Sequence, residues 1–368
     1  MTDTQLQEPT VSIASPAVGR EEIHKVHEVL RSGRLSGGEA VDAFGSEFAD
    51  YCDVAHGIPT SNGTTALHAA LAALDIGPGD TVVTTPFSFI ATANAIRHVG
   101  AEPLFADIDP ETYNLDPDRV DAVAADAADG VDAILAVHLY GCPAPVSELQ
   151  SVADRHDAAL VEDCAQAHGA TYRGDPVGSF GDAGCFSFYP TKNMTTGEGG
   201  MVVTDRDDVA QRCHSFIDHG RSPDGGHERV GHNFRMTDIC AALGRVQLSK
   251  LDDFVAARRE NAAQFDDAID GDAIQPPVEP ADCRHAYHQY TVRTADRAAL
   301  ADHLADYGVD SAVYYPTPIH EEPAYDGFDV QLPAAERAAS EVLSVPVHPE
   351  LSPRDVRSIS LALTEYST

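Results

Sequence analysis

The chain has 368 residues, of which 59 are acidic and 24 are basic, so its formal net charge is −35. This excess of carboxylates argues against nucleic acid as a partner, because phosphate binding needs a basic face. The length predicts two domains, or one large domain with a smaller companion, and the sequence contains no apolar run of about 18 residues that would predict a transmembrane helix.

The acidic residues are spread along the chain, and lysine occurs at three positions only. This composition is typical of proteins adapted to high salt, where screening suppresses the mutual repulsion of carboxylates; an ordinary acidic protein is the alternative. The seven cysteines show no Cys-x-x-Cys spacing, and residues 1–16 lack the features of a secretory signal. We therefore expect reduced thiols and a cytoplasmic location.

Helical periodicity predicts helices at residues 20–32 and 39–52, followed by the turn Ser61-Asn62-Gly63 and an Ala- and Leu-rich helix that begins near Thr64. A glycine and hydroxyl residues at a helix start favour phosphate binding. Simple helix capping is the alternative, and the Gly-Lys-Ser/Thr of a Walker loop is missing.

Apolar strands and amphipathic helices then alternate. Strands are predicted at 80–85, 101–106, 131–138 and 158–163, and helices at 88–98 and 146–156. This order predicts an α/β fold with a mostly parallel sheet covered on both faces. Ligands of such sheets bind beyond the carboxyl ends of the strands, where Asp163 lies. Capping of the next turn is the alternative role for this aspartate.

Lys192 lies between two apolar segments, residues 185–189 and 201–203, whereas Lys25 and Lys250 lie in charged helical runs and are expected to be solvated. A cation between buried segments is costly unless it is paired or used chemically. Such a lysine has a lowered pKa and can form a Schiff base with an aldehyde cofactor. A surface lysine in a hairpin loop is the alternative.

The rest of the chain predicts a smaller α+β domain. Expected elements are a helix at 205–214, a Gly- and His-rich loop at 219–232, a long helical connector at 237–269, strands at 287–292 and 312–316, and helices at 295–307, 334–343 and 353–366. The loop histidines have no compact metal-ligand spacing, so no metal is expected. We place the large cofactor-binding α/β domain at 12–248 and the small C-terminal domain at 249–368.

Four features together predict a pyridoxal phosphate site: the helix start near Thr64, the aromatic segment 87–89, Asp163 and Lys192. The phosphate needs backbone N–H groups and hydroxyls, and the ring needs a stacking partner. The ring nitrogen needs a carboxylate, and the aldehyde needs a lysine.

Over nearly its whole length the sequence resembles the DegT/DnrJ/EryC1/StrS sugar aminotransferases, which are fold type I pyridoxal phosphate enzymes. The resemblance rests on the segments 32–38, 61–67, 86–92, 138–141, 162–169, 187–193, 197–200, 231–238 and 315–320.

The resemblance implies four residues around the cofactor ring. Lys192 matches the Schiff-base lysine, and Asp163 matches the partner of the pyridine nitrogen. Gln166 matches the residue beside the phenolic oxygen, and Phe89 matches the aromatic side chain that stacks on the ring.

The resemblance also implies residues around the phosphate. Thr64, Thr65 and Ser187 match its ligands, at the turn that contains Gly63. Asn233 matches a residue that reaches the phosphate from the other subunit, which implies a homodimer.

The implied reaction is a transamination of a nucleotide-activated keto sugar, with L-glutamate as the amino donor and Lys192 as general acid and base. The segment Gly197-Glu-Gly-Gly200 favours a 4-keto-6-deoxy sugar, and the product would enter glycan or polysaccharide synthesis. The partners are thus a sugar nucleotide and an amino acid, and no membrane is expected.

Three other functions remain. A keto-cyclitol transaminase fits the same residues. A non-catalytic regulatory protein that retains the fold is disfavoured by the intact Lys192 and Asp163, and Lys192 also argues against a sugar 3-dehydrase. A nicotinamide dehydrogenase is disfavoured because no Gly-x-Gly-x-x-Gly follows a strand.

Overall fold

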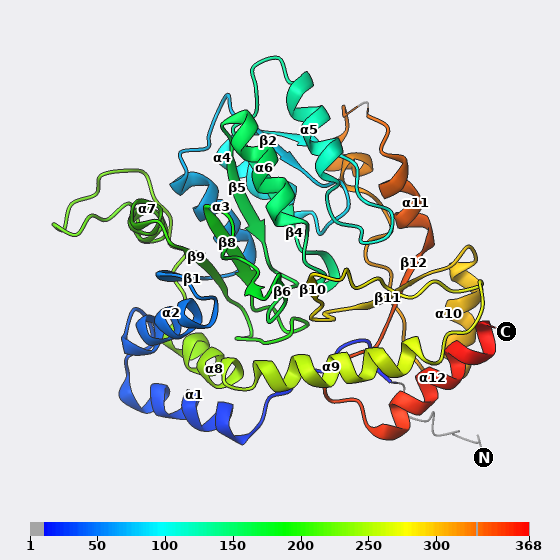
Figure 1. The fold of residues 1–368 in the computed structure, drawn as a ribbon. Helices are drawn as coiled ribbons and strands as arrows, with labels where there is room; N and C mark the ends of the chain where they lie inside the picture. Colours follow the sequence, from blue (N-terminus) through cyan, green and yellow to red (C-terminus); the bar gives the residue numbers. More distant parts are fainter. Residues whose placement is uncertain (1–10, 329, 368) are drawn as a thin grey trace.

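A seven-stranded sheet in the order β1-β9-β8-β5-β4-β2-β3 runs through the larger part of the molecule (Figure 1). The structure is a computed structural model and describes residues 11–328 and 330–367. The strands are β1 His56–Thr60, β2 Thr81–Thr84, β3 Glu102–Phe105, β4 Ala133–Val137, β5 Ala159–Asp163, β8 Ala183–Ser187 and β9 Gly200–Thr204. The five strands β3, β2, β4, β5 and β8 are parallel to one another, and β9 is antiparallel to β8 and β1.

Helices cover both faces of this sheet because successive strand residues point to opposite sides. On β2, for example, Val82 belongs to an apolar cluster that includes residues of α3 and α4, whereas Val83 belongs to the cluster that includes residues of α5 and α6. The helices of this part are α1 Arg20–Ser32, α2 Glu39–Tyr51, α3 Gly63–Ala73, α4 Ala91–Val99, α5 Pro117–Asp126, α6 Val146–His156, α7 Asp207–Ile217 and α8 Asp238–Leu248. Aromatic side chains of α2 pack on β8, where Phe48 contacts Phe186. The predicted α/β architecture is therefore confirmed.

A separate apolar core is built by the C-terminal segments around Tyr290 and Phe265. It comprises α9 Leu251–Asp266, α10 Arg297–Asp306, α12 Pro353–Ser367 and the antiparallel pair β11 Tyr290–Arg293 with β12 Val342–Val345. The remaining elements are short or peripheral: β6 Thr171–Tyr172, β7 Asp175–Pro176, β10 Cys283–Arg284, α11 Pro333–Glu341 and the 3-10 turns Leu139–Gly141, Ile319–Glu321 and Pro323–Tyr325.

Three predicted elements differ in the structure. The connector expected at 237–269 is two helices, α8 and α9, that are separated at Ser249 and Lys250. Residues 312–316 do not form a strand, although Ala312 makes an isolated bridge to Ser344. The helix expected to end at 343 stops at Glu341, because the apolar run that follows pairs with β11 as strand β12.

Lys250 corrects a further expectation, since it is not simply solvated. It lies at the junction of α8 and α9 and pairs with Glu21 and with the buried Glu22 on α1. Lys25 does lie exposed on α1, where it pairs with Glu28.

All seven cysteines are free thiols, and five of them are buried. Burial raises the pKa of Cys213 to about 12, and that of Cys164 well above its usual value. Within residues 11–328 and 330–367, every helix is too short or too polar to cross a membrane.

Candidate active site

A cavity of about 850 Å³ lies beyond the carboxyl ends of β5 and β8. Its wall includes eight of the nine residues singled out in the sequence: Gly63, Thr64, Thr65, Phe89, Asp163, Gln166, Ser187 and Lys192. The ninth, Asn233, is exposed and is not part of the wall of this cavity. The sheet therefore brings together residues that are up to about 130 positions apart in the sequence.

The start of α3 forms one end of the cavity. Asn62 is the N-cap, and its Oδ1 accepts a hydrogen bond from the Thr65 amide at 2.9 Å, while the Thr65 hydroxyl accepts from the Asn62 amide at 3.1 Å. The hydroxyl of Thr65 thus serves in a capping box. The amides of Gly63 and Thr64 lie in the first turn, where helix geometry provides no acceptor, so they can bind an anion.

Gly63 is required by its distance from Ser187. A Cβ atom at Gly63 would lie 2.6 Å from the Cβ of Ser187, closer than carbon atoms can pack. The absence of a side chain lets the Ser187 hydroxyl lie directly beside the helix start. This arrangement combines backbone amides, hydroxyls and the positive end of a helix, which suits a phosphate group.

Asp163 ends strand β5 and is only 4% exposed. Its Oδ2 accepts a hydrogen bond from the Thr92 hydroxyl at 2.9 Å, and its Oδ1 accepts from the Ala165 amide at 3.1 Å. Burial raises the pKa of Asp163, and the donors together with the charge of Lys192 only partly offset that rise. A cationic nitrogen against this carboxyl group would favour its ionised form.

Lys192 follows β8 in a turn, where its amide donates to the Tyr189 carbonyl at 2.9 Å. Its side chain is partly exposed to the cavity, yet surrounding protein atoms desolvate the ammonium group. This burial lowers the pKa of Lys192 to about 8, and the nearby charge of Asp163 limits the decrease. The lysine can therefore exchange a proton near neutral pH, and the interpretation as an ordinary surface lysine does not hold.

Gln166 and Phe89 also line the wall of this cavity. The Gln166 Oε1 accepts from the Tyr140 amide at 2.7 Å, and its Nε2 donates to the Tyr315 hydroxyl at 3.0 Å, so the orientation of its amide is fixed. The Phe89 ring is 55% exposed and lies 6.0 Å from the Tyr315 ring. An exposed aromatic ring on a cavity wall is suited to stack on a planar ligand.

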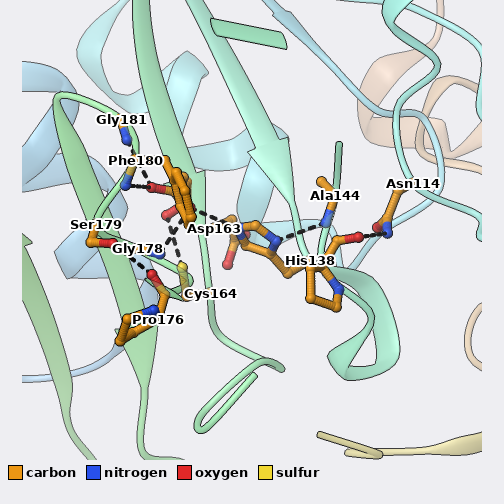
Figure 2. Close-up of polar contacts among 12 residues, drawn as sticks. Asn114, His138, Ala144, Asp163, Cys164, Pro176, Gly178, Ser179, Phe180 and Gly181 are labelled. Atoms are coloured by element: carbon orange, nitrogen blue, oxygen red, sulfur yellow. Dashed lines mark hydrogen bonds and ion pairs between the residues drawn. The ribbon is translucent and has the colours of Figure 1, made fainter. Parts of the chain in front are cut away.

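A buried histidine and glutamate support the end of β5 (Figure 2). His138 Nδ1 accepts a hydrogen bond from the Ala144 amide at 2.9 Å, so its Nε2 carries the proton and donates to Glu162 at 3.0 Å. Glu162 Oε2 also accepts a hydrogen bond from the Gly178 amide, and Glu162 Oε1 accepts from the amides of Phe180 and Gly181, each at 2.8 Å. His138 and Glu162 thus have their hydrogen-bond partners within the protein, and these bonds position the strand that carries Asp163.

Several residues of the site were not singled out in the sequence, namely Thr92, Tyr315, His138 and His288. Thr92 lies one helical turn after Ser88, and their hydroxyls are 2.9 Å apart, but its link to Asp163 spans 71 residues. Tyr315 lies within the expected strand 312–316, and only the tertiary fold places its hydroxyl on Gln166. Thr92, His138 and Tyr315 lie in segments that carry the family resemblance, and His288 lies in the strand expected at 287–292, but the tertiary partners of these residues could not be predicted from the sequence.

Known proteins resemble this chain over almost its full length. The profile of the DegT/DnrJ/EryC1/StrS aminotransferase family matches residues 16–364. A pleiotropic regulatory protein of Geobacillus stearothermophilus is 39% identical over 92% of this chain and 92% of its own length. A UDP-N-acetyl-3-dehydro-α-D-glucosamine 3-aminotransferase of Acidithiobacillus ferrooxidans is 38% identical over 89% and 87%. The crystal structure of S. venezuelae DesV in complex with a ketimine intermediate superposes with a TM-score of 0.94, at 36% identity, over 98% of this chain and 99% of that one.

Proposed function

Because this chain belongs to the DegT/DnrJ/EryC1/StrS aminotransferase family, we propose that it transfers the amino group of L-glutamate to the keto group of a nucleotide-activated 4-keto-6-deoxy sugar. The chain is a pyridoxal-phosphate-dependent aminotransferase with nucleotide-sugar aminotransferases among its relatives. The sugar, the reacting carbon and the amino donor are the parts that we add.

The residues of the cavity fit the cofactor. The amides of Gly63 and Thr64 and the hydroxyls of Thr64 and Ser187 suit its phosphate, since Gly63 leaves room where a Cβ would clash. We assign Phe89 to one face of the ring. When bound, pyridoxal phosphate acts as an electron sink that stabilises the charge left by a broken C–H bond.

Asp163 and Gln166 orient the ring in this proposal. The Asp163 carboxylate holds a proton on the ring nitrogen, because an opposite charge favours the protonated form of a base. Thr92 and Ala165 hold the carboxylate in place through one hydrogen bond to each oxygen. The Gln166 amide is fixed by Tyr140 and Tyr315, and we place it beside the ring oxygen.

Lys192 is the residue that moves protons. With a pKa of about 8 it has an accessible neutral form. The neutral amine can accept a proton from the substrate carbon and then donate it to a different carbon of the reacting groups. The single observation that carries the proposal is that Lys192 and Asp163 lie on the wall of one cavity, close enough for each to influence the charge of the other.

The choice of the 4-keto sugar depends on a small feature. Resemblance of the segment Gly197-Glu-Gly-Gly200 to family members implies reaction at C4, and Glu198 of this segment lies on the cavity wall. The name of the Acidithiobacillus relative instead specifies a 3-aminotransferase. Both positions therefore have to be compared directly.

The test is a substrate panel of nucleotide sugars with the keto group at C3 or at C4, together with a keto-inositol, each supplied with glutamate and pyridoxal phosphate. We expect the 4-keto-6-deoxy sugar to be aminated fastest, as measured by mass spectrometry of the product and by release of 2-oxoglutarate. A Lys192→Ala variant serves as the control and should form no product. Preference for a 3-keto sugar would contradict the assigned carbon, and exclusive use of keto-inositol would identify a cyclitol transaminase.

A regulatory role is the second candidate, because the Geobacillus relative carries that name. The complete set of Lys192, Asp163 and the helix start of α3 argues for catalysis instead. If glutamate fails to convert the bound cofactor but another amino acid converts it, only the proposed donor is wrong. If no amino donor converts the bound cofactor, the regulatory role is favoured.

A further inference from the structure

A small polar chamber lies behind Lys192. Its volume is about 20 Å³, and roughly 10–15 Å³ is enough for one water molecule. The chamber is covered by the N-terminal segment 13–17 and closed by side chains from α9 and from the loops around β11 and β12. Lys192 and His288 line both the chamber and the main cavity, so the two spaces meet at these residues.

Four side chains of the chamber carry a polar atom that lacks a hydrogen-bond partner within the described part of the chain. The atoms are Asn193 Oδ1, Arg258 Nε, His288 Nδ1 and His348 Nδ1. Each of the four residues is at least nine-tenths buried, with exposures of 3%, 5%, 5% and 6%. Buried polar atoms are nearly always paired, so a cluster of four around one small cavity indicates a shared partner.

The donor and acceptor character of three of these atoms is settled by their other contacts. His348 Nε2 donates to the Ser12 carbonyl at 3.0 Å, so the Nδ1 of the neutral ring is an acceptor. The Asn193 amide nitrogen donates to the Ala286 carbonyl at 3.0 Å, so the Oδ1 of this chamber residue is a second acceptor. Arg258 Nε–H can only donate.

A water molecule satisfies this set, whereas an anion does not. Water donates two hydrogen bonds, here to Asn193 and His348, and accepts two, of which Arg258 supplies one. An anion would face the two acceptors without a proton to offer them. The second lone pair of the water requires another N–H donor. His288 Nδ1, the fourth atom of the set, supplies this donor if it carries the ring proton.

We propose that one water molecule in this chamber fixes His288 in the tautomer with its proton on Nδ1, so that Nε2 is an uncharged hydrogen-bond acceptor beside the amino group of Lys192. His288 is then a positioning residue. It accepts a hydrogen bond from the free amine of Lys192 and so fixes the position of that amine. The proposal rests on the proposed function only in the role of Lys192.

The charges around the chamber agree with an uncharged imidazole. Burial, followed by the charges of Lys192 and Arg258, lowers the pKa of His288 well below its ordinary value. Arg258 has carbonyl partners, Tyr287 and His288, and burial lowers its pKa to about 9. The guanidinium therefore remains charged at neutral pH and provides the fixed donor that orients the water.

Neutron diffraction from crystals of the holoenzyme in D₂O tests the proposal directly. We expect one water whose deuterons point to Asn193 Oδ1 and His348 Nδ1, and a deuteron on His288 Nδ1 but not on Nε2. A deuteron on Nε2, or a chamber without water, would overturn it. This result does not depend on the substrate, so it is independent of the outcome of the sugar panel.

A pair of variants tests the consequence for Lys192. His288→Asn places an amide near the position of Nδ1 and removes Nε2, whereas His288→Gln places an amide near the position of Nε2. We expect His288→Asn to slow the conversion of bound cofactor by glutamate about tenfold or more, and His288→Gln to retain a rate within about threefold. The melting temperatures of both variants should stay close to that of the parent.

The second readout is the pH dependence of cofactor attachment to the apoenzyme, which reports the pKa of Lys192. Loss of the acceptor in His288→Asn should change this pKa, while His288→Gln should preserve it. If His288→Asn keeps the parental rate and the parental pH profile, the histidine only fills space and the proposal is wrong. If a variant does not fold, the deuteron position in the parent protein decides.

Discussion

Asp163 and Lys192 could be identified from the sequence as candidate site residues. The residues that orient them or shift their pKa could not. Asp163 was marked by its place at a strand end and Lys192 by its apolar flanks, and both are local signals. Thr92 and His288 act through partners about 70 and 100 residues away from them in the chain. The Thr65 hydroxyl serves the helix cap, which was the alternative interpretation of this helix start, and its role as a phosphate ligand stays a prediction.

The Asp163→Asn variant should still bind the cofactor but should lose most of the rate at which glutamate converts it. Asparagine has the same size and can still hydrogen-bond a ring nitrogen, but it supplies no negative charge to keep that nitrogen protonated. We expect the conversion of bound cofactor on addition of glutamate to fall by orders of magnitude, since each ~1.4 kcal/mol of lost stabilisation slows the rate about tenfold. The absorbance of the cofactor after rapid mixing measures this rate.

The matched control for this substitution is Thr92→Val, which removes a neutral donor from Asp163 and leaves the charge in place. Its rate should fall far less than that of Asp163→Asn. Equal rates for Asp163→Asn and the parent would mean that Asp163 is only a turn cap, held by its bond from Ala165.

At the level of elements, the sequence predicted strands and helices well in segments that show a single hydrophobic periodicity, either that of a helix or that of a strand. Residues 20–32 and 146–156 form helices with the predicted bounds, and β5 ends at Asp163 as expected. The errors occur where tertiary contacts decide. Residues 342 and 343 were expected to end a helix but pair with β11, and the helix expected at 237–269 breaks where Lys250 turns toward α1.

The junction of α1 with α8 and α9 depends on Glu22. Its carboxylate accepts hydrogen bonds from Lys250 at 2.8 Å, Gln247 at 2.9 Å and the Gly19 amide at 2.9 Å. Burial alone would raise the pKa of Glu22, but these donors together lower it to about 2.

Glu22→Gln should therefore lower the free energy of unfolding by about 2 kcal/mol at pH 7, because hydrogen bonds to a buried charge are lost or weakened. Glu21→Gln is the matched control, since Glu21 contacts the same Lys250 from an exposed position, and it should change stability by less than about 0.5 kcal/mol. Urea unfolding of the three proteins provides the comparison.

The effect of Glu22 should also depend on pH. The folded pKa of about 2 lies below the ordinary value of 4.5, so the carboxylate contributes its full stabilisation above pH 4.5 and loses it as the pH falls toward 2. The difference between the parent and Glu22→Gln should accordingly shrink below pH 4.5. A difference that stays constant to pH 3, or one that is already missing at pH 7, would contradict the role of this ion pair.

For the whole molecule, the net charge of −35 predicts a dependence on salt. Screening by concentrated salt reduces the repulsion among carboxylates, and its removal should favour expanded states. We expect circular dichroism to show loss of structure when the protein is dialysed below molar salt. Retention of both fold and activity at low salt would identify an ordinary acidic protein.

Assembly is a second property of the whole molecule. Asn233 is exposed and follows a segment after α7 that projects from the body in Figure 1, and Val230 in this segment is 90% exposed. We expect a homodimer in which Asn233 reaches the phosphate site of the partner subunit.

Mixing two inactive variants tests this assembly. Hybrids of Lys192→Ala with Asn233→Ala should regain roughly a quarter of the parental activity, because half of the randomly assorted dimers contain one intact site. A fully active monomer in light scattering would contradict the prediction, as would an Asn233→Ala protein with parental activity.

The position of β1 at the edge of the sheet has a consequence for synthesis of the chain on the ribosome. Its neighbour is β9, and the register joins Thr60 to Gly200, so about 140 residues must be translated before the strand can pair. At roughly 5–20 residues per second this takes on the order of 7–30 s. The turn that begins α3 directly follows β1 and rests against Ser187 and Gly200. We therefore expect the nascent chain to acquire its affinity for the cofactor late, after more than half of it has emerged.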